Sequence, residues 1–362
     1  MFQLHPFLVQ PTFRNRVWGG KKLGPWVSRV TITSDHFAMK RTAGRVGEAW
    51  LLSDLPATVL DGRSPVITRE VGVDSLHDLM ANPPTRRALM GRATPAGTEG
   101  SPLFPLLLKL LDAGQNLSLQ VHPDPTFAMR NPSALVKNEL WLVLEADPGA
   151  VIYRGIHPTV TREECKRHIE QNTLLSVMVT EPAHAGDCFW LPAGICHALG
   201  EGLLVAEVQT PSDTTFRVWD WGRSDPARSL DIESAMECML LGDEQNLATL
   251  DRPHTPNVVR TDAIAIEGLV RSEWFDVERW IIHPGTSLQH SGIGVPVIWT
   301  ILEGEFEMGP SATRLLRGAT LVLPAHHSGL EGRTGPSGAE ILVTTLEDPA
   351  KSNRQFGGLR LA

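Results

Sequence analysis

With 362 residues, the chain is long enough for two domains of ordinary size, each with its own core. Hydrophobic residues make up 42% of it and charged residues 20%, which is the balance of a globular protein and excludes a disordered one. The formal net charge of -8 comes without a long block of either sign, so no nucleic-acid partner is expected. A small anionic substrate stays open, because only local Arg and Lys matter for its binding.

Targeting signals and disulfides are not expected. The first twenty residues lack a basic segment followed by a long apolar run, and no stretch approaches the roughly 18 apolar residues of a membrane span. The four cysteines are unevenly spaced and form no CxxC pair; they are Cys165, Cys188, Cys196 and Cys238. This usage predicts reduced thiols in a cytoplasmic protein. Because the chain has neither a long apolar run nor a basic block, we expect neither a membrane nor a nucleic-acid partner.

Three helices are expected in the N-terminal two thirds of the chain. Over 73–91, apolar residues recur every three or four positions and two prolines interrupt them. A second helix is expected over 161–178, because Thr161 followed three residues later by Glu164 forms a capping-box pattern. A third is expected over 229–241.

Between these helices the chain breaks into short apolar segments. With 32 glycines and 27 prolines, most stretches between breaks are brief and rich in Val, Ile, Leu, Phe and Trp, which is typical of strands in an all-β barrel or sandwich. The expected strands are 140–146, 150–155, 187–194, 203–210 and 214–221. The sequence therefore predicts a mainly β fold with helical insertions.

A polar stretch with two prolines over 246–263 has the composition of a linker. We place a domain boundary near residue 250, which gives an N-terminal domain over 1–248 and a C-terminal domain over 249–362. Four segments beyond the boundary read as a second set of strands: 277–285, 296–309, 317–325 and 339–347.

The motif with the clearest chemistry is GDCFWLPAGICHAL, which begins at Gly186. Gly186 is followed after five residues by Pro192, and the motif continues through Gly194 to His197. This spacing indicates a strand, a sharp Pro-Gly turn and a histidine at the start of the next strand, pointing into the barrel.

Three residues upstream complete a candidate metal site. Gln120 and His122 are two apart in LSLQVHPD, so on a strand they share a face. Glu139 follows seventeen residues after His122, at the start of the next expected strand. Taken singly, His197 could be a surface histidine and Glu139 an exposed partner of Lys137. Together, two imidazoles, a carboxylate and an amide oxygen suit a divalent ion such as zinc.

These strings resemble a known family. GxxxxxPxGxxH resembles the second motif of the cupin superfamily, and the longer strings are similar to type I mannose-6-phosphate isomerases, particularly the short bacterial form. The strings are WGGKKLG (18–24), GEAWLLS (47–53), PLLLKLLDAGQNLSLQVHPD (105–124), KNELWLVLEADPGA (137–150) and LPAGICHALGEGLLVAEVQTPSDTTFRVWDWGR (191–223). The resemblance covers most of residues 1–240 in the same order.

The resemblance implies two cupin-like jelly-roll barrels, of which the N-terminal one is catalytic and holds one Zn²⁺ or another divalent metal. In the family, the residues matching Gln120, His122, Glu139 and His197 bind zinc. The implied activity is aldose–ketose isomerisation between mannose 6-phosphate and fructose 6-phosphate through an enediol. This reaction needs a base near C1 and C2, an electrophile on the oxygens and an anchor for the phosphate.

Glu207 is the first candidate for the base, because burial on an apolar strand raises the pKa of a carboxyl and because it aligns with an acidic residue assigned to proton transfer in the family. A solvent-facing glutamate is the alternative. Lys137 is a second acid/base candidate or a charge that steers the substrate. Arg217 lies in an aromatic strand and needs an anionic partner, and the resemblance places it at the active site. Ser118 and Arg223 match phosphate-holding positions, although a solvated charge explains Arg223 equally well.

The C-terminal part repeats the pattern only weakly. Residues 318–324 echo the glycine–strand–proline pattern, but no Gln/His pair or suitably placed Glu accompanies them. His326 and His327 are adjacent, so on a strand they face opposite ways and cannot both be ligands. We therefore expect a degenerate cupin-like domain without metal and with a structural role.

Two other functions stay open at this point. One is isomerisation of a different sugar phosphate, and the other is a non-catalytic cupin that binds a metal and senses a sugar. The presence of Lys137, Glu207 and Arg217 argues against the second, since binding alone needs no base.

Overall fold

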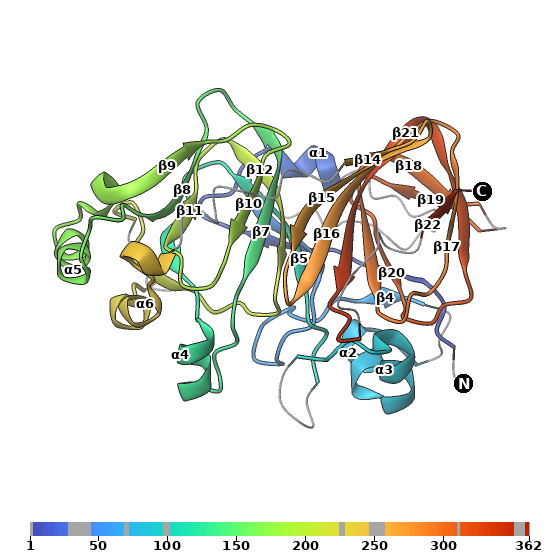
Figure 1. Ribbon diagram of the computed structural model, residues 1–362, viewed down its shortest axis with the longest axis horizontal. Helices are drawn as coiled ribbons and strands as arrows, with labels where there is room; N and C mark the ends of the chain where they lie inside the picture. The colour runs from blue at the N-terminus through green and yellow to red at the C-terminus, as the bar shows by residue number, and fades with distance from the viewer. Residues whose placement is uncertain are drawn as a thin grey trace.

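A computed structural model describes residues 3–27, 45–68, 72–96, 102–223, 229–245, 258–309, 312–350 and 359–361. Most elements are β-strands, which form three antiparallel sheets with short helices at the periphery (Figure 1). The predicted mainly β fold is thus confirmed. Among the described helices, none is both long and apolar enough to cross a membrane.

Two of the sheets pack face to face in the N-terminal part. The six-stranded sheet has the order β10 (Cys188–Leu191), β7 (Glu139–Ala146), β12 (Leu203–Gln209), β5 (Leu107–Ala113), β3 (Val46–Leu52) and β2 (Thr12–Asn15). The five-stranded sheet has the order β13 (Phe216–Trp219), β6 (Leu119–Val121), β11 (His197–Leu199), β8 (Val151–Ile156) and β9 (Met178–Pro182). Trp141 and Leu111 of the first share one buried cluster with Ile152 and Leu199 of the second.

The space between these two sheets is divided between an apolar and a polar end. Along β12, alternate residues face the same way, and this face carries Leu203, Val205, Glu207 and Gln209 in turn. Leu203 and Val205 belong to the apolar cluster. The polar half of the strand therefore projects Glu207 into the other end of the same space.

The third sheet gathers the C-terminal strands. Its main path is β14 (Val258–Arg260), β15 (Ile264–Arg271), β16 (Phe275–Ile282), β21 (Leu330–Leu346), β18 (Val297–Met308), β20 (Thr320–Leu323), β1 (Phe7–Val9) and β4 (Val66–Ile67). Three further strands pair off this path: β17 (Ser287–His290), β19 (Thr313–Leu316) and β22 (Leu359–Leu361).

The predicted boundary near residue 250 lies outside the described residues, so the division into 1–248 and 249–362 stays a prediction. The third sheet nevertheless crosses this division, because β1 pairs with β20 and β4 pairs with β1.

A large apolar cluster joins the six-stranded sheet to the third sheet. Leu108 and Leu140 on the outer face of the former pack with Phe275, Val277 and Leu342 of the latter. The six-stranded sheet is therefore covered on both faces, which explains why every residue of its inner strands β5 and β12 is buried. The expected reduced thiols are confirmed, since all four cysteines are free and buried.

The helix expected over 73–91 is divided in two. Helix α2 (Leu76–Ala81) ends at Asn82, and α3 (Pro83–Met90) begins there with a proline in its first turn. A proline ring fits the first turn of a helix but clashes inside one, so the second helix starts where the first must stop.

The other two predicted helices are shorter than expected. Helix α5 (Arg162–Glu170) starts with the predicted capping box of Thr161, but it stops eight residues before residue 178. Asn172 takes a left-handed φ of 56°, which ends the helix, and η1 (Leu174–Val177) is a separate 3₁₀ turn. Helix α6 (Ile232–Cys238) lies inside the predicted 229–241.

Two further helices were not predicted from the sequence. They are α1 (Leu23–Val27) and α4 (Pro125–Arg130).

The C-terminal part contains a buried histidine pair that the sequence did not indicate. His326 is exposed and His327 is buried, so the two do face opposite ways as expected. His327 Nδ1 accepts from the Gly329 N–H (3.2 Å), which leaves its Nε2–H to donate to His290 Nδ1 (3.0 Å). The His290 ring packs edge to face with Trp299, with the two ring centroids 5.5 Å apart, and its Nε2 is buried without a hydrogen-bond partner among the described residues. Both imidazoles are therefore held neutral.

This pair predicts a stability loss on mild acidification. Burial lowers the pKa of His290 to about 3 and that of His327 to about 4, whereas an unfolded histidine titrates near 6.5. Because the unfolded chain binds these protons first, stability falls as the pH drops from about 6.5 to 4, by on the order of 1–2 kcal/mol per histidine at pH 5. Denaturant unfolding at pH 7 and pH 5 measures this loss. His290→Leu should show a shallower fall and exposed His326→Gln should not; equal slopes in all three proteins would contradict the prediction.

Candidate metal centre and active site

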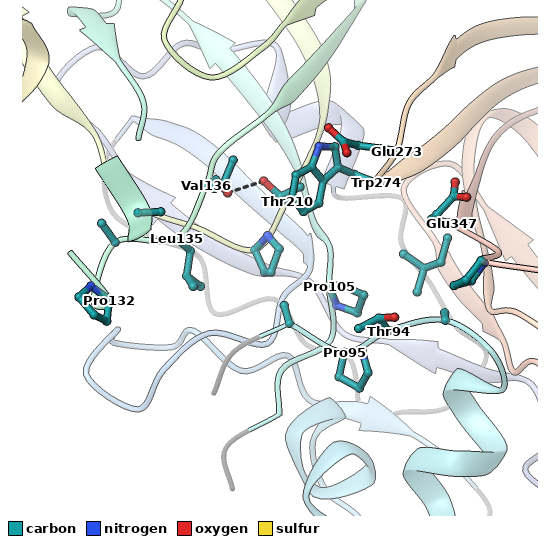
Figure 2. Close-up of a pocket in the computed structure, with 17 residues that line it drawn as sticks. Thr94, Pro95, Pro105, Pro132, Leu135, Val136, Thr210, Glu273, Trp274 and Glu347 are labelled. Carbon is teal, nitrogen blue, oxygen red and sulfur yellow. Dashed lines mark hydrogen bonds between the residues drawn. The ribbon is translucent and has the colours of Figure 1, made fainter. Parts of the chain in front are cut away.

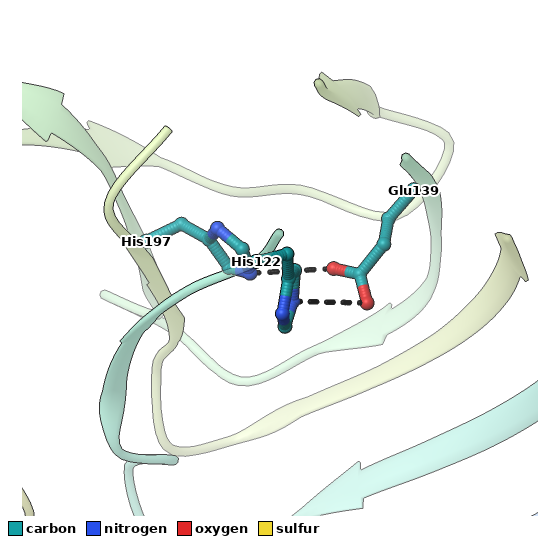
Figure 3. A group of neighbouring side chains, drawn as sticks. All are labelled: His122, Glu139 and His197. Atoms are coloured by element: carbon teal, nitrogen blue, oxygen red, sulfur yellow. Dashed lines mark ion pairs between the residues drawn. The ribbon is translucent and has the colours of Figure 1, made fainter. Parts of the chain in front are cut away.

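His122, Glu139 and His197 come together at the polar end between the two N-terminal sheets. His122 directly follows β6, Glu139 is the first residue of β7 and His197 is the first residue of β11. Figure 3 shows the three side chains pointing toward one another, and one ligand atom of each lies within 4.8 Å of the others. All three are buried, at 0–1% exposure.

The tautomers of the two histidines determine whether the cluster can bind a cation. His197 Nδ1 lies 2.8 Å from the carbonyl of Ile195, and His122 Nδ1 lies 3.2 Å from that of Thr214. A carbonyl only accepts, so both Nδ1 atoms carry the proton and both Nε2 atoms present lone pairs. These lone pairs face the Glu139 carboxylate at 3.3 Å and 3.2 Å, acceptor against acceptor. Such an arrangement is stable only around a cation, and the residues therefore fit a divalent metal.

Lys137 supplies part of the positive charge beside this cluster. Its Nζ lies 2.7 Å from Glu139 Oε1 and 3.2 Å from His122 Nε2. Burial alone would raise the pKa of Glu139, but Lys137 and His122 outweigh burial and hold it well below the usual range. Burial and Lys137 lower the pKa of His122 to about 3, so that its imidazole stays neutral and able to bind metal.

The backbone register brings Gln120 and Arg217 to the same face of the five-stranded sheet. The Cα of Gln120 is directly opposite that of His197 on β11 and that of Arg217 on β13. Residues directly opposite in an antiparallel pair project to one face, so Gln120 lies beside His197. The predicted fourth ligand is thus placed next to the cluster.

A cavity of about 400 Å³ adjoins the cluster of His122, Glu139 and His197, and Gln120 and Lys137 are in its wall. Its charged side chains come from both sheets: Arg14, Arg16, Glu48, Lys109, Lys137, Glu207, Asp213 and Arg217. Cations outnumber carboxylates in this lining, and a cavity of this kind attracts a small anion.

Glu207 lies in the cavity within a cross-strand row. It is directly opposite Lys109 on β5 and Trp141 on β7. Trp141 Nε1 donates to Glu207 Oε2 (2.8 Å), and Lys109 Nζ lies 2.9 Å from Glu207 Oε1. Burial alone would lower the pKa of Lys109, but Glu207 and Glu48 raise it and keep the ammonium charged. The solvent-facing alternative for Glu207 is excluded, since it is only 4% exposed.

Of the three predicted phosphate contacts, two line the cavity and the third does not. Ser118 and Arg217 line the cavity. Arg223 pairs with Asp220 and is not among the lining residues in the described part of the chain. Lys109, Arg14 and Arg16 line it as well, and sequence reasoning missed all three.

A second cavity, of about 420 Å³, lies where the N-terminal sheets meet the third sheet (Figure 2). Prolines, Leu135 and Trp274 line it, and its described lining includes neither a histidine nor a cation. One wall is the segment that leads to Lys137. Thr210 Oγ1 donates to the Val136 carbonyl (2.7 Å) and accepts from the Asn138 N–H (3.1 Å), which fixes the backbone on both sides of Lys137.

We expect Thr210→Val to loosen this segment. A buried N–H and a part-buried carbonyl lose their partner, at a cost of about 1–3 kcal/mol in unfolding free energy. Thr344→Val is the matched control, because the buried Thr344 hydroxyl has no described partner. Denaturant unfolding tests the pair; a wild-type unfolding free energy in Thr210→Val would show that this segment is held by other contacts.

The fold and the site together define a class: a β-sandwich protein with a buried His–Glu–His cluster that could hold a metal ion, and a cationic cavity beside it. No family model matches the chain. Mannose-6-phosphate isomerase of Streptococcus mutans is 30% identical over 322 residues, which span 88% of this chain and 92% of that protein. Mannose-6-phosphate isomerase of Bacillus subtilis is 29% identical over 325 residues, spanning 88% and 93%.

Solved structures agree with these relatives. The crystal structure of mannose 6-phosphate isomerase from Bacillus subtilis matches with a TM-score of 0.76 and 26% identity, covering 94% of this chain and 99% of that one. Phosphomannose isomerase from Salmonella typhimurium shares the fold, with a TM-score of 0.66 at 16% identity. The chain belongs to the mannose-6-phosphate isomerase family.

Proposed function

We propose that this protein interconverts mannose 6-phosphate and fructose 6-phosphate through an enediol. The observation that carries the proposal is the His122–Glu139–His197 cluster, in which two imidazole lone pairs face a carboxylate at the edge of a cationic cavity. Membership of the family supports this choice of substrate. A cytoplasmic location and two cupin barrels, the N-terminal one binding metal, are part of the same proposal.

Gln120, His122, Glu139 and His197 would hold one Zn²⁺ or another divalent ion. When bound, the metal would polarise the oxygens at C1 and C2 as negative charge develops on them. The protein's own contribution is to keep both histidines in the Nδ1–H tautomer through the carbonyls of Ile195 and Thr214, so that the Nε2 atoms are always ready to bind.

Glu207 is proposed as the base that moves the proton between C1 and C2. Trp141 and Lys109 hold one carboxylate oxygen each, so that the group is fixed before substrate binds. Lys137 is proposed to act as a further acid or base, or to steer the sugar phosphate. It is buried and lies between the cluster and the cavity.

Arg217 is proposed to act in catalysis and to bind the phosphate, with Ser118 and Arg223 as further phosphate contacts. Arg217 and Ser118 are in the cavity wall, which supports their assignment. The support for Arg223 is its match to the family alone.

Purified protein assayed on mannose 6-phosphate tests the proposal. Activity should disappear on chelation and return with zinc. Turnover of a different hexose phosphate alone would favour the second enzyme activity considered above. Metal-replete protein that isomerises no hexose phosphate would leave the non-catalytic sugar-binding cupin, which the buried, ion-paired Glu207 disfavours.

A further inference from the structure

One arginine of the cavity forms no ion pair among the described residues. Arg16 makes a bidentate pair with Glu48 (2.8 and 3.0 Å), Lys109 pairs with Glu207 and Lys137 pairs with Glu139. Arg14 lies on β2, directly opposite Glu48, yet within the described residues no carboxylate is at ion-pair distance from it. Its charge is therefore balanced only by carboxylates beyond ion-pair distance, namely Glu48, Asp61 and Asp213.

The guanidinium of Arg14 is nevertheless held firmly in place. Its Cζ lies 3.6 Å from the ring centroid of Trp50, a stacked cation–π contact. Its Nη2 donates to the Leu60 carbonyl at 2.7 Å. Trp50 is fixed in turn, because its Nε1 donates to Glu48 Oε2 at 2.7 Å. The group is thus preorganised by an aromatic face and a carbonyl, neither of which neutralises it.

Glu48 is engaged mainly by other cations. Burial alone would raise the pKa of Glu48, but Lys109 and Arg16 lower it to about 2. Burial and the charge of Arg16 lower the pKa of Arg14, and the opposing charges of Glu48, Asp61 and Asp213 do not fully offset this effect. Arg14 Nε is also buried without a hydrogen-bond partner among the described residues. An anion with several acceptor oxygens would accept from Arg14 Nε and favour the charged form of its guanidinium.

The place of Arg14 in the sheet fits the far end of an elongated substrate. Glu139 is on β7 and Arg14 is on β2, with β12, β5 and β3 between them. At about 4.8 Å per strand, β7 and β2 are roughly 19 Å apart across the sheet, and side chains projecting into the cavity from both shorten this gap. Glu207 and Lys109 lie between the two ends on the same face.

We propose that Arg14, stacked on Trp50, binds the phosphate group of the substrate at the end of the cavity remote from the metal cluster. This inference rests on the proposed function and adds to it an anchor on the six-stranded sheet. The planar guanidinium offers paired N–H donors that match phosphate oxygens, and the indole keeps it from turning away when the cavity is empty.

Steady-state kinetics of Arg14→Gln on mannose 6-phosphate test the assignment. We expect KM to rise about ten- to a hundredfold with kcat nearly unchanged, because a charge-assisted contact to a non-reacting group is lost. The inhibition constant of inorganic phosphate should rise by a similar factor. Arg14→Lys keeps the charge but not the planar fork, so both constants should rise less. Metal content and thermal melting should match wild type.

Arg317→Gln is the matched control. Arg317 stacks on Trp26 with its Cζ 3.9 Å from the ring, but it pairs with Glu303 and Glu145 and is not in the described cavity wall. Its KM and phosphate inhibition should equal those of wild type. Wild-type constants in a folded Arg14→Gln, or a fall in kcat with KM unchanged, would overturn the inference. If wild type turns over no hexose phosphate, the proposed function fails, and calorimetric titration with inorganic phosphate still tests Arg14 by itself.

Discussion

Glu139→Gln is expected to lose its metal and at least about a thousandfold in kcat/KM. The carboxylate is the only charged group among the four proposed ligands, and its two oxygens face the Nε2 lone pairs of His122 and His197. Glutamine keeps the volume but replaces one acceptor oxygen with an N–H donor that can satisfy a histidine lone pair. The electrophile is then lost, and several kcal/mol of transition-state stabilisation correspond to about three orders of magnitude.

Two measurements separate this loss from misfolding. Elemental analysis should find one metal ion per wild-type chain and a small fraction of that in the variant. Adding zinc at about 100 times its dissociation constant should stabilise wild type by about 2.7 kcal/mol and the variant much less. Glu340→Gln is the control, because Glu340 makes a bidentate pair with Arg279 in the third sheet, away from the cluster. Full metal occupancy in Glu139→Gln would remove Glu139 from the ligand set.

Features that depend on neighbouring residues could be predicted from the sequence. The capping box of Thr161 starts α5, and the i, i+2 spacing of Gln120 and His122 predicts side chains on one face, at β6 and the residue directly after it. Local apolar patterns likewise predicted that Glu139 and His197 lie at the starts of strands. The end of α5 was missed because the signal is a single residue, Asn172, whose left-handed conformation outweighs the apolar pattern that follows it.

Features that depend on strand order and register could not be predicted. Lys109 and Glu207 are 98 positions apart and meet only because β5 and β12 are neighbours with those residues directly opposite. The same holds for His290 and His327. The sequence analysis considered only the neighbouring residues His326 and His327, so it could not predict that His327 pairs with His290. Strand β1 joins the third sheet through β20, more than 300 residues later, and no local pattern indicates this pairing.

The ion pair of Glu207 with Lys109 bears on how Glu207 could act as a base. The Glu207 carboxylate accepts from Trp141 Nε1 and pairs with Lys109, so that each of its oxygens has a fixed neighbour. We therefore propose that the base is a Lys109–Glu207 unit and not an isolated carboxyl. Lys109 also donates to Gln209 Oε1 (2.7 Å), a second contact that holds its ammonium in place beside Glu207.

Glu207→Gln is accordingly expected to lower kcat about 10²- to 10⁴-fold, the usual contribution of a general base, with metal content unchanged. Exchange of the C2 hydrogen of mannose 6-phosphate with solvent deuterium should slow by the same factor, because it reports proton abstraction without product release. Glu278→Gln is the matched control, since half-buried Glu278 also accepts from an indole, Trp280 Nε1, at 2.8 Å, but lies in the third sheet. A glutamine variant at 207 with wild-type exchange would transfer the base role to Lys137, the other titratable group that lies between the cluster and the cavity. Loss of exchange in Glu207→Gln but not in Glu278→Gln would instead assign the proton transfer to the Lys109–Glu207 unit.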